Sequence, residues 1–352
     1  MVSPRWKQLA DDRKLRERLT ARSEIVFGIR QFFRQLGFAE VETPTVVPHP
    51  GMEPNLDPFE TEVIGQGGER YCAGLITSPE YALKKLLAAG YGRVFEITRC
   101  YRNREPWGGR HNPEFAMIEW YRSGADYCAI MEDTERLVGT LAVALHGKSK
   151  VEWRGNQIDL SAPWERLTVA EAFRRSTDID LDEMVDDPEG FRKSVRAAGY
   201  ETADDDSVDD LFFRVFLRDV EPNLGFGRPV FLCDYPRQMA SLSRLKPSDP
   251  RYAERFEAYA CGMELCNAFS ELNDPAEQRR RLEEERQARI DAGKIAFPID
   301  DDFVEAVGHM PDSAGIALGI DRLVMLLTDA GSIEDVTYFP AAGLFGGPSE
   351  KP

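Results

Sequence analysis

The spacing of apolar residues along the chain predicts a mixture of helices and strands. Apolar residues recur every three or four positions over 13–36 and over 126–146, which is typical of amphipathic helices. Within 38–47, residues up to Pro44 alternate between apolar and polar and predict a half-buried strand. Two β-rich runs within 93–122 flank a loop rich in Gly, Pro and Trp, and predict a long antiparallel hairpin.

The second half of the chain continues this pattern. It contains an apolar strand over 229–236, a strand-like run over 263–274 and a charged helix over 275–293. A further strand over 315–320 leads into an apolar helix. Because the strands come in hairpin-like runs without a regular βαβ alternation, the predicted fold class is α+β, with an antiparallel β-sheet flanked by helices.

Length and charge narrow the class of protein. The 352 residues predict two domains or one large domain, at roughly 150 residues per domain. With 61 acidic and 44 basic residues, the net charge is −17, which argues against broad nucleic-acid binding. Residues 179–210 are strongly acidic, and we interpret them as part of a solvated helical insertion over about 165–225, with a partner-docking surface as the alternative.

The cysteines and the amino terminus indicate a cellular compartment. Six cysteines are spread along the chain without a CxxC pair and without histidine at metal-ligand spacing, so we expect reduced, mostly buried thiols. The amino-terminal stretch has no apolar signal core, and no apolar run approaches about 18 residues. The sequence therefore predicts a cytoplasmic protein that does not contact membranes.

Candidate phosphate chemistry rests on two arginines. No GxxxxGK[ST] or GxGxxG loop follows a strand, which disfavours P-loop and Rossmann enzymes. Arg102 lies on the first arm of the predicted hairpin, and Arg322 directly follows the strand at 315–320. Each guanidinium can bind a phosphate in bidentate fashion, although a surface ion pair is the alternative for any single arginine.

The sequence around both arginines resembles the class II aminoacyl-tRNA synthetases, lysyl branch, from about residue 10 to 340. The segments that resemble motifs 1, 2 and 3 occur in the family's order, as GFAEVETP (37–44), RCYRNREPWGGRHNPEFAMIEWY (99–121) and GIALGIDR (315–322). The resemblance implies a class II catalytic core that forms a homodimer through motif 1. It also implies one catalytic domain over 1–352 without an anticodon-binding domain, since motif 1 begins near residue 24.

Within this branch, local features resemble the elongation factor P lysine ligases. Ser78 and Ala317 stand where the synthetases usually have Ala and Gly, and both would line the amino-acid pocket. NLDPFET (55–61) and DYPRQMASL (234–242) are also ligase-like, whereas 267–275 and 332–340 look as much like the synthetases. The resemblance implies that ATP and Mg²⁺ are used to activate (R)-β-lysine or lysine as an adenylate. The acyl group would pass to a lysine side chain of elongation factor P, and tRNA binding is not expected.

The resemblance also implies roles for individual residues. Arg102 matches the arginine at the α-phosphate and substrate carboxylate, Arg322 the arginine at the γ-phosphate and adenine, and Glu257 and Glu264 the pair that holds Mg²⁺. The other residues implied at ATP are Asn103, Glu105, His111, Asn112, Phe115, Ala258 and Gly319. The amino-acid pocket would be formed by Ser78, Pro79, Glu80, Glu119, Tyr121, Glu264, Asn267, Phe269, Glu271 and Ala317.

One loop departs from the family's pattern, and two other hypotheses about the function remain. The motif 2 loop, Arg104 to Arg110, is one residue longer than in the family, so its usual ATP-contacting glutamate is either displaced to Glu105 or replaced by Arg104. The second hypothesis is a stand-alone lysyl-tRNA synthetase-like enzyme that charges tRNA or another carrier with lysine. The third is a catalytically inactive paralogue that serves as a regulatory binding subunit.

Overall fold

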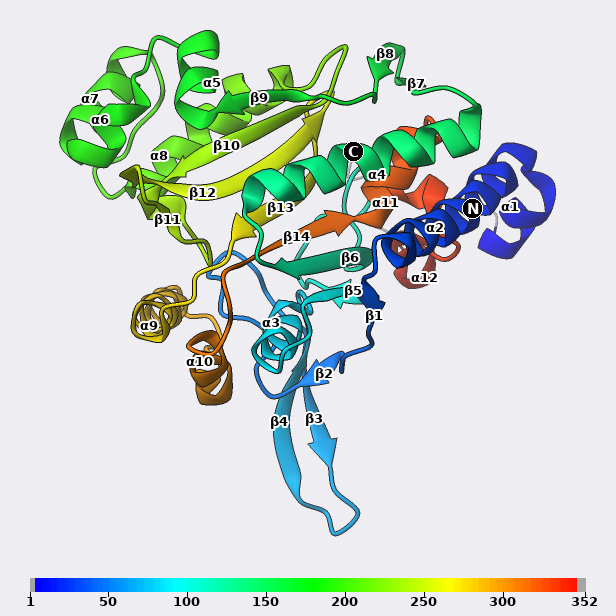
Figure 1. Cartoon of the computed structure of the whole chain (residues 1–352), viewed down its shortest axis with the longest axis horizontal. Coiled ribbons are helices and arrows are strands. Elements are labelled where there is room, and N and C mark those ends of the chain that lie inside the picture. Colours follow the sequence, from blue (N-terminus) through cyan, green and yellow to red (C-terminus); the bar gives the residue numbers. More distant parts are fainter. Residues whose placement is uncertain (1–3, 347–352) are drawn as a thin grey trace. The chain divides into compact units, whose positions relative to one another are not determined.

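The computed structural model describes residues 4–346, which form two compact units (Figure 1). Unit 1 contains the chain up to Ser123, Asn273–Pro311 and the chain from Ala317 onward, and unit 2 contains Gly124–Leu272 and Asp312–Ile316. The single domain over 1–352 stays a prediction, and residues 1–3 and 347–352 lie outside the described part of the chain.

The central strands of unit 1 confirm the predicted hairpin. β5 (Arg93–Tyr101) and β6 (Glu114–Ser123) pair antiparallel along their length, and the short β1 (Ala39–Glu40) joins β5 in parallel. A second sheet has the order β2-β4-β3, with β2 at Val46–Val47, β3 at Glu60–Ile64 and β4 at Arg70–Leu75.

The predicted helix over 13–36 is confirmed as α2 (Arg13–Gln35). Its first turn is capped by the Asp12 carboxylate, which accepts a hydrogen bond from the Leu15 N–H at 3.0 Å. Phe33 on its buried face packs against Phe95 and Trp120 of the hairpin, with ring centroids 5.1 and 4.9 Å away. The other helices of unit 1 are α1 (Arg5–Asp11), α3 (Glu80–Ala88), α9 (Pro275–Asp291), α10 (Asp301–Val307), α11 (Ile320–Leu327), α12 (Ala341–Phe345) and the 3₁₀ turn Ile333–Val336.

The predicted strand up to Pro44 is confirmed only at β1. β2 follows Pro44 and belongs to a different sheet. Pro44 between them has no N–H to donate to a ladder. The preceding Thr43 instead donates its N–H (2.9 Å) and hydroxyl (2.8 Å) to the buried carboxylate of Glu96 on β5. These side-chain bonds replace strand pairing and turn the chain away from β5.

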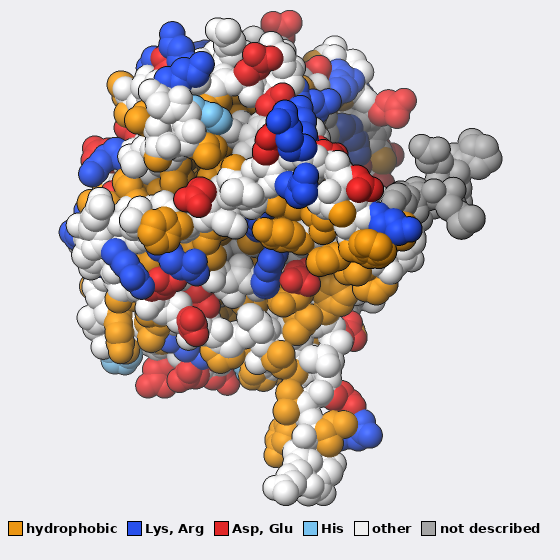
Figure 2. Space-filling model, turned by 90° about the vertical axis from the view of Figure 1, so that its right-hand side faces the viewer, with side chains coloured by type: hydrophobic (Ala, Val, Ile, Leu, Met, Phe, Trp, Pro, Cys, Tyr) orange, Lys and Arg blue, Asp and Glu red, His pale blue; other side chains and the backbone are white. Residues whose placement is uncertain are grey.

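The β3–β4 hairpin, which the sequence did not predict, extends away from the rest of unit 1 (Figure 1). Apolar side chains lie along this arm (Figure 2), where Val63, Ile64 and Tyr71 are 46%, 59% and 59% exposed. Strands whose faces are not packed on a core lose the alternation by which sequence analysis detects them, and all five residues of β3 are exposed.

Unit 2 is built on strands in the order β13-β12-β10-β9, with β11 also on β12. Their bounds are β9 at Glu165–Thr168, β10 at Val230–Pro236, β11 at Leu245–Lys246, β12 at Asp249–Ala260 and β13 at Met263–Ser270. All of these pairs are antiparallel except β9 with β10. β7 (Lys150–Trp153) and β8 (Asn156–Asp159) form a separate hairpin, α4 is Tyr127–His146, and β14 (Ser313–Gly319) contributes residues to both units. The fold is therefore α+β, as predicted.

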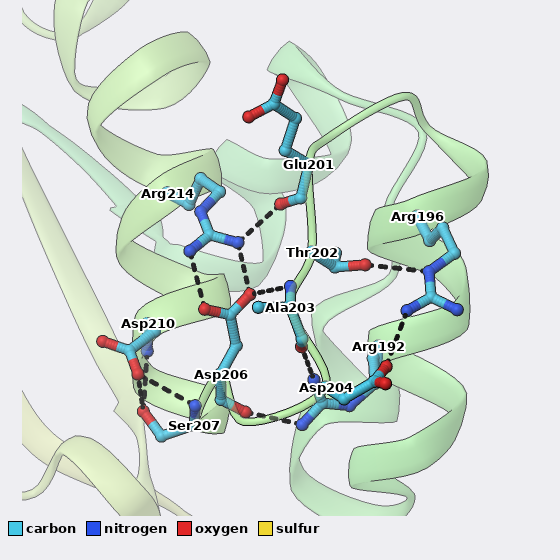
Figure 3. Close-up of polar contacts among 10 residues, drawn as sticks. All are labelled: Arg192, Arg196, Glu201, Thr202, Ala203, Asp204, Asp206, Ser207, Asp210 and Arg214. Atoms are coloured by element: carbon cyan, nitrogen blue, oxygen red, sulfur yellow. Dashed lines mark hydrogen bonds and ion pairs between the residues drawn. The ribbon is translucent and has the colours of Figure 1, made fainter.

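The acidic stretch is helical, as predicted. Its region contains α5 (Val169–Ser176), α6 (Leu181–Asp186), α7 (Pro188–Ala197), α8 (Val208–Val215), a π-helical turn Phe216–Val220 and a 3₁₀ turn Glu221–Asn223. Apolar residues such as Phe173, Phe191 and Phe212 are buried between these helices. In the loop before α8, Asp206 accepts hydrogen bonds from Arg214 (2.8 Å) and from the Ala203 N–H (2.7 Å) (Figure 3).

Two further expectations concern cysteines and membranes. All six cysteines are free thiols, and four of them are buried, which confirms the expectation of reduced, mostly buried residues. Over residues 4–346, none of the helices combines the length and the apolar character needed to cross a membrane.

Candidate functional site

Arg102 follows β5 directly and is fixed by its own backbone. Its N–H donates to the Pro113 carbonyl at 2.9 Å, which continues the pairing of the hairpin by one step. Its guanidinium lies 5.0 Å from the ring of Phe115 on β6, a cation–π contact that orients the charge. The buried Nε atom has no hydrogen-bond partner within residues 4–346. The structure therefore brings the two predicted nucleotide residues together and leaves a donor for an anionic ligand.

The motif 2 loop places a glutamate beside the arginines. Glu105 Oε2 lies 3.0 Å from His111 Nδ1, and this contact lowers the pKa of Glu105, with smaller contributions from Arg102 and Arg322. Arg104 is exposed, and its φ of 59° belongs to the left-handed region. Glu105 is thus the loop carboxylate near both arginines, which favours the reading in which the family's glutamate is displaced by one residue.

The two predicted asparagines hold the loop's backbone. The Asn112 side chain donates to the Glu114 carbonyl (2.5 Å) and accepts from the Ala341 N–H (3.0 Å). Asn103 accepts a hydrogen bond from the N–H of the next residue at 2.9 Å. Asn112 is buried, whereas Asn103 is exposed, and the single hydrogen bond that Asn103 accepts leaves its amide NH2 group able to donate to a ligand.

The turn from β14 into α11 carries the third motif. Ala317 and Gly319 share one face of β14 because the buried Leu318 points to the other. The Arg322 side chain passes over Gly319, since a Cβ placed there would lie 3.9 Å from its stem. Gly319 has an ordinary negative φ of −73°, so what the glycine provides is open space beside Arg322, and no special backbone conformation is needed.

A buried carboxylate on β6 is held by two of the predicted pocket residues. Glu119 accepts hydrogen bonds from the Ser78 hydroxyl (2.6 Å) and the Tyr121 hydroxyl (2.9 Å). The Ser78 hydroxyl also accepts from the N–H of Glu80, at the start of α3, where Pro79 is the N-cap. An alanine at position 78 could make neither bond. Residues from two distant segments, Ser78 on one side and Glu119 with Tyr121 on the other, thus form one polar group.

Glu80 lines a cavity of about 380 Å³ in unit 1, together with Ser78 and Pro79. Its carboxylate pairs with Lys84, whose side chain is fully buried. Sequence analysis missed a second acidic residue of this cavity, Glu53. Burial raises the pKa of Glu53, and Glu80 raises it further, while Arg102 lowers it. The only signal in the sequence was a charged residue between Met52 and Pro54 in a stretch rich in Pro and Gly.

Glu285 on α9 gives a pH-dependent prediction. Burial, reinforced by Glu53 and Glu80, raises its pKa to about 8. Between the ordinary pKa of a glutamate and about 8, the folded protein therefore keeps a proton on Glu285 that the unfolded chain has released. The free energy of unfolding falls as pH rises through this interval. We expect E285Q to match the wild type at about pH 5 and to exceed its free energy of unfolding by roughly 1–3 kcal/mol at about pH 9, measured by urea denaturation. The exposed neighbour variant E283Q should follow the wild-type profile; an E285Q profile parallel to the wild type would contradict the assignment.

In unit 2, Glu257 is the centre of a hydrogen-bonded group. Its Oε1 accepts from Arg255 at 2.6 Å, and its Oε2 accepts from the hydroxyls of Tyr235, at 2.6 Å, and Tyr259. Burial raises the pKa of both tyrosines, and the charge on Glu257 raises it further. The side chain of Glu257 is thus fixed, with three of its roughly four acceptor positions filled.

Arg255, which sequence analysis did not identify, connects the predicted residues of unit 2. Its Nε donates to Asn267 at 3.2 Å, and its guanidinium lies 5.9 Å from the ring of Phe269. Ala258 is buried, and by strand alternation its side chain points to the face opposite Glu257. Only its backbone can serve the predicted ATP contact. The signal that could have revealed Arg255 is its spacing of two from Glu257 on one strand.

The remaining predicted residues of unit 2 are Glu264 and Glu271. Glu264 lies opposite Tyr259 in the β12–β13 register. Glu271 is buried, and its N–H donates to the Ser313 carbonyl at 2.9 Å. No group of three or more His, Cys, Asp or Glu side chains within residues 4–346 is arranged to hold a metal alone. Two carboxylates nevertheless fit Mg²⁺, because this ion keeps water ligands and takes phosphate oxygens from substrates.

The comparisons with known proteins agree with the motifs. The model of the family described as tRNA synthetases class II (D, K and N) matches residues 2–343. A lysine–tRNA ligase from Magnetococcus marinus is 39% identical over 341 residues, which cover 96% of this chain and 66% of the relative. A lysine–tRNA ligase from Agrobacterium fabrum is 40% identical over 333 residues, 94% of this chain and 65% of the relative. The chain thus spans slightly less than two thirds of the length of these relatives.

Proposed function

Because this chain belongs to the class II tRNA synthetases (D, K and N), we propose that it is an ATP-dependent ligase that activates lysine or (R)-β-lysine as an aminoacyl-adenylate. The observation that carries this proposal is the arrangement in unit 1, where Arg102 has an unused buried donor and the Ser78 hydroxyl joins the Glu119 carboxylate to the start of the helix that carries Glu80. An arginine suits the carboxylate and phosphate of the reacting groups, and acidic side chains suit the ammonium groups of a dibasic amino acid.

The reaction needs little covalent chemistry from the protein. The substrate carboxylate attacks the α-phosphorus of ATP, an oxygen–phosphorus bond forms, and pyrophosphate leaves with the electron pair of the broken bond. Arg102 neutralises charge that develops at the α-phosphate, and Arg322 binds the γ-phosphate end, so positioning and electrostatic stabilisation supply most of the rate enhancement. Phe115 holds the Arg102 guanidinium in place and offers its ring to the adenine.

Mg²⁺ would be held by Glu257 and Glu264. When bound with ATP, such an ion neutralises phosphate charge. Glu257 is already oriented by Arg255, Tyr235 and Tyr259, so its carboxylate does not have to be ordered when a ligand arrives. This preorganisation lowers the entropic cost of binding the metal–nucleotide complex.

The choice between α- and β-lysine is proposed to depend on Ala317. Its methyl group lies on the same face of β14 as Gly319, toward the space beside Arg322. We expect A317G to raise kcat/KM for L-lysine relative to (R)-β-lysine by about tenfold, since one methyl group in a pocket changes discrimination by roughly 1–3 kcal/mol. ATP–pyrophosphate exchange with both amino acids measures the ratio. An unchanged ratio of the two kcat/KM values would show that Ala317 does not discriminate between the two positions of the amine.

For the acceptor, we propose a lysine ε-amine of elongation factor P, which attacks the adenylate carbonyl and displaces AMP. Ser78 and Ala317, the two ligase-like positions, support this choice. The names of the relatives support the second candidate, transfer to tRNA or another carrier. Radiolabelled amino acid incubated with elongation factor P and with tRNA(Lys) distinguishes them, and label on tRNA alone would refute the protein acceptor.

The test of the whole proposal is ATP–pyrophosphate exchange with L-lysine, (R)-β-lysine and other amino acids. Exchange that depends on one of the two lysines is expected. No exchange with any amino acid would reject both ligase hypotheses and would favour the inactive regulatory paralogue. A homodimer, proposed from the resemblance of 37–44 to motif 1, is checked by light scattering at the same protein concentration.

A further inference from the structure

We infer that Glu53 is a substrate-binding residue, whose carboxylate accepts a hydrogen bond from the ammonium group that lies nearer the carboxylate of the amino-acid substrate. This inference rests on the proposed activation of lysine or (R)-β-lysine. Glu53 is not one of the residues that the motifs point to. It follows Gly51 and Met52 in the segment between β2 and β3 and lines the cavity that also contains Ser78 and Glu80.

The position of the Glu53 carboxylate is defined by its neighbours. A Cβ built on Gly51 would lie 2.7 Å from Glu53 Oε2 and 2.7 Å from Thr77 Oγ1, so the Glu53 carboxylate and the Thr77 hydroxyl both lie against Gly51. The Thr77 hydroxyl donates elsewhere, to the Pro50 carbonyl at 3.2 Å. Gly51 therefore provides the space that the Glu53 side chain occupies, and any larger residue would displace it.

Glu53 Oε2 lacks a partner in the folded protein. The atom is buried, and it has no hydrogen-bond partner within the described part of the chain. A buried carboxylate oxygen without a donor is costly, and the cost disappears when a cationic donor occupies the adjoining space. The adjoining space is the cavity of about 380 Å³, which is large enough for a lysine-sized ligand. The other acids that line it are already paired, Glu80 with Lys84 and both Asp300 and Asp302 with Lys85.

The surroundings of Glu53 indicate which ammonium group it meets. The Tyr101 N–H donates to the Ile76 carbonyl at 2.9 Å and the Asn103 N–H to the Asp57 carbonyl at 2.6 Å, so the backbone on both sides of Arg102 is bonded to the segments that flank Glu53 and its cavity. The charge of Arg102 also lowers the pKa of Glu53, while that of Glu80 raises it. The part of the substrate next to Arg102 is its carboxylate end, where L-lysine carries an ammonium group on C2 and β-lysine on C3. The distal ammonium group, several bonds farther along the side chain, would meet other carboxylates.

The test separates the two ends of the substrate. ATP–pyrophosphate exchange is measured for the wild type, E53Q and the control E60Q, which alters an exposed glutamate at the start of β3. We expect E53Q to raise KM for L-lysine and for (R)-β-lysine by about 10- to 100-fold, with KM for ATP unchanged. Inhibition by 6-aminohexanoate, which has the carboxylate and the distal amine but no amine near the carboxylate, should be unaffected by E53Q. E60Q should behave as the wild type.

An unchanged KM for both lysines, or an equal weakening of 6-aminohexanoate, would overturn the inference. If E53Q does not fold, E53D takes its place, because aspartate keeps the charge but is one methylene shorter and draws the carboxylate away from the ligand, and the same pattern is expected. If the wild type shows no exchange at all, the proposed function fails. Binding of lysine at Glu53 is then tested separately, by the change in Tm that lysine causes. A lysine-induced rise in Tm that E53Q loses would support the site, whereas an equal or absent rise would reject it.

Discussion

Replacing Arg102 by alanine is expected to lower the rate of ATP–pyrophosphate exchange by about 10³-fold while the protein remains folded. The side chain makes one orienting contact, the 5.0 Å cation–π contact with Phe115, and its buried Nε has no partner within residues 4–346. The folded protein therefore depends little on this charge, whereas the proposed reaction depends on it at the atoms that react. Single-turnover kinetics and a denaturation curve for R102A measure the two effects separately.

The matched controls for R102A are R102K and R99A. Lysine keeps the charge but lacks the planar guanidinium that binds two oxygens at once, so R102K should recover part of the lost rate. Arg99 lies on β5, three residues before Arg102, and makes an exposed ion pair with Glu114 at 3.7 Å, so R99A should retain activity. Wild-type activity in R102A, or equal losses in R102A and R99A, would contradict the role proposed for Arg102.

The sequence predicted site residues that lie within a single motif. It also predicted those that occupy alternate positions of one strand and therefore share a face. Arg102 and Phe115 come together because β5 and β6 form where the pattern predicts the hairpin. Ser78 reaches Glu119 and Tyr121 because α3, which the pattern did not predict, begins beside β6. The family resemblance contributed the choice of residues, and the strand register explains why alternate positions of β6 share a face.

Residues whose roles depend on contacts between distant segments could not be predicted. Glu53 matters because Gly51 leaves room for its carboxylate and because the cavity adjoins it, and neither fact is visible in the local pattern. In the sequence, Arg255 is one charged residue among many. Only the pairing of its strand, β12, with β13 brings it to Asn267. Similarly, the predicted strand up to Pro44 is shorter than expected because Glu96, distant in sequence, binds Thr43.

Replacing Asp321 by alanine is expected to cost about 3–5 kcal/mol of unfolding free energy. Asp321 precedes Arg322 on α11 and forms an ion pair with Arg22 of α2, with only 4% and 10% of the two side chains exposed. Its second oxygen accepts from the Ala116 N–H on β6 at 2.7 Å. The Arg22 guanidinium also donates to the Val336 carbonyl at 3.0 Å. Removing the carboxylate leaves a buried guanidinium without its counter-charge, and urea denaturation measures the loss.

Two further variants show whether the cost arises from the unpaired charge. In the double variant R22M/D321A no buried charge is left unpaired, so its loss should be smaller than the sum of the two single losses. R13A removes an arginine of the same helix whose pair with Glu17 is 85% and 63% exposed, and should cost less than about 1 kcal/mol. Additive losses in the double variant would mean that the two residues act independently. In that case α11 would be held by its apolar face alone, and the ion pair would not be what fixes the start of the helix that presents Arg322.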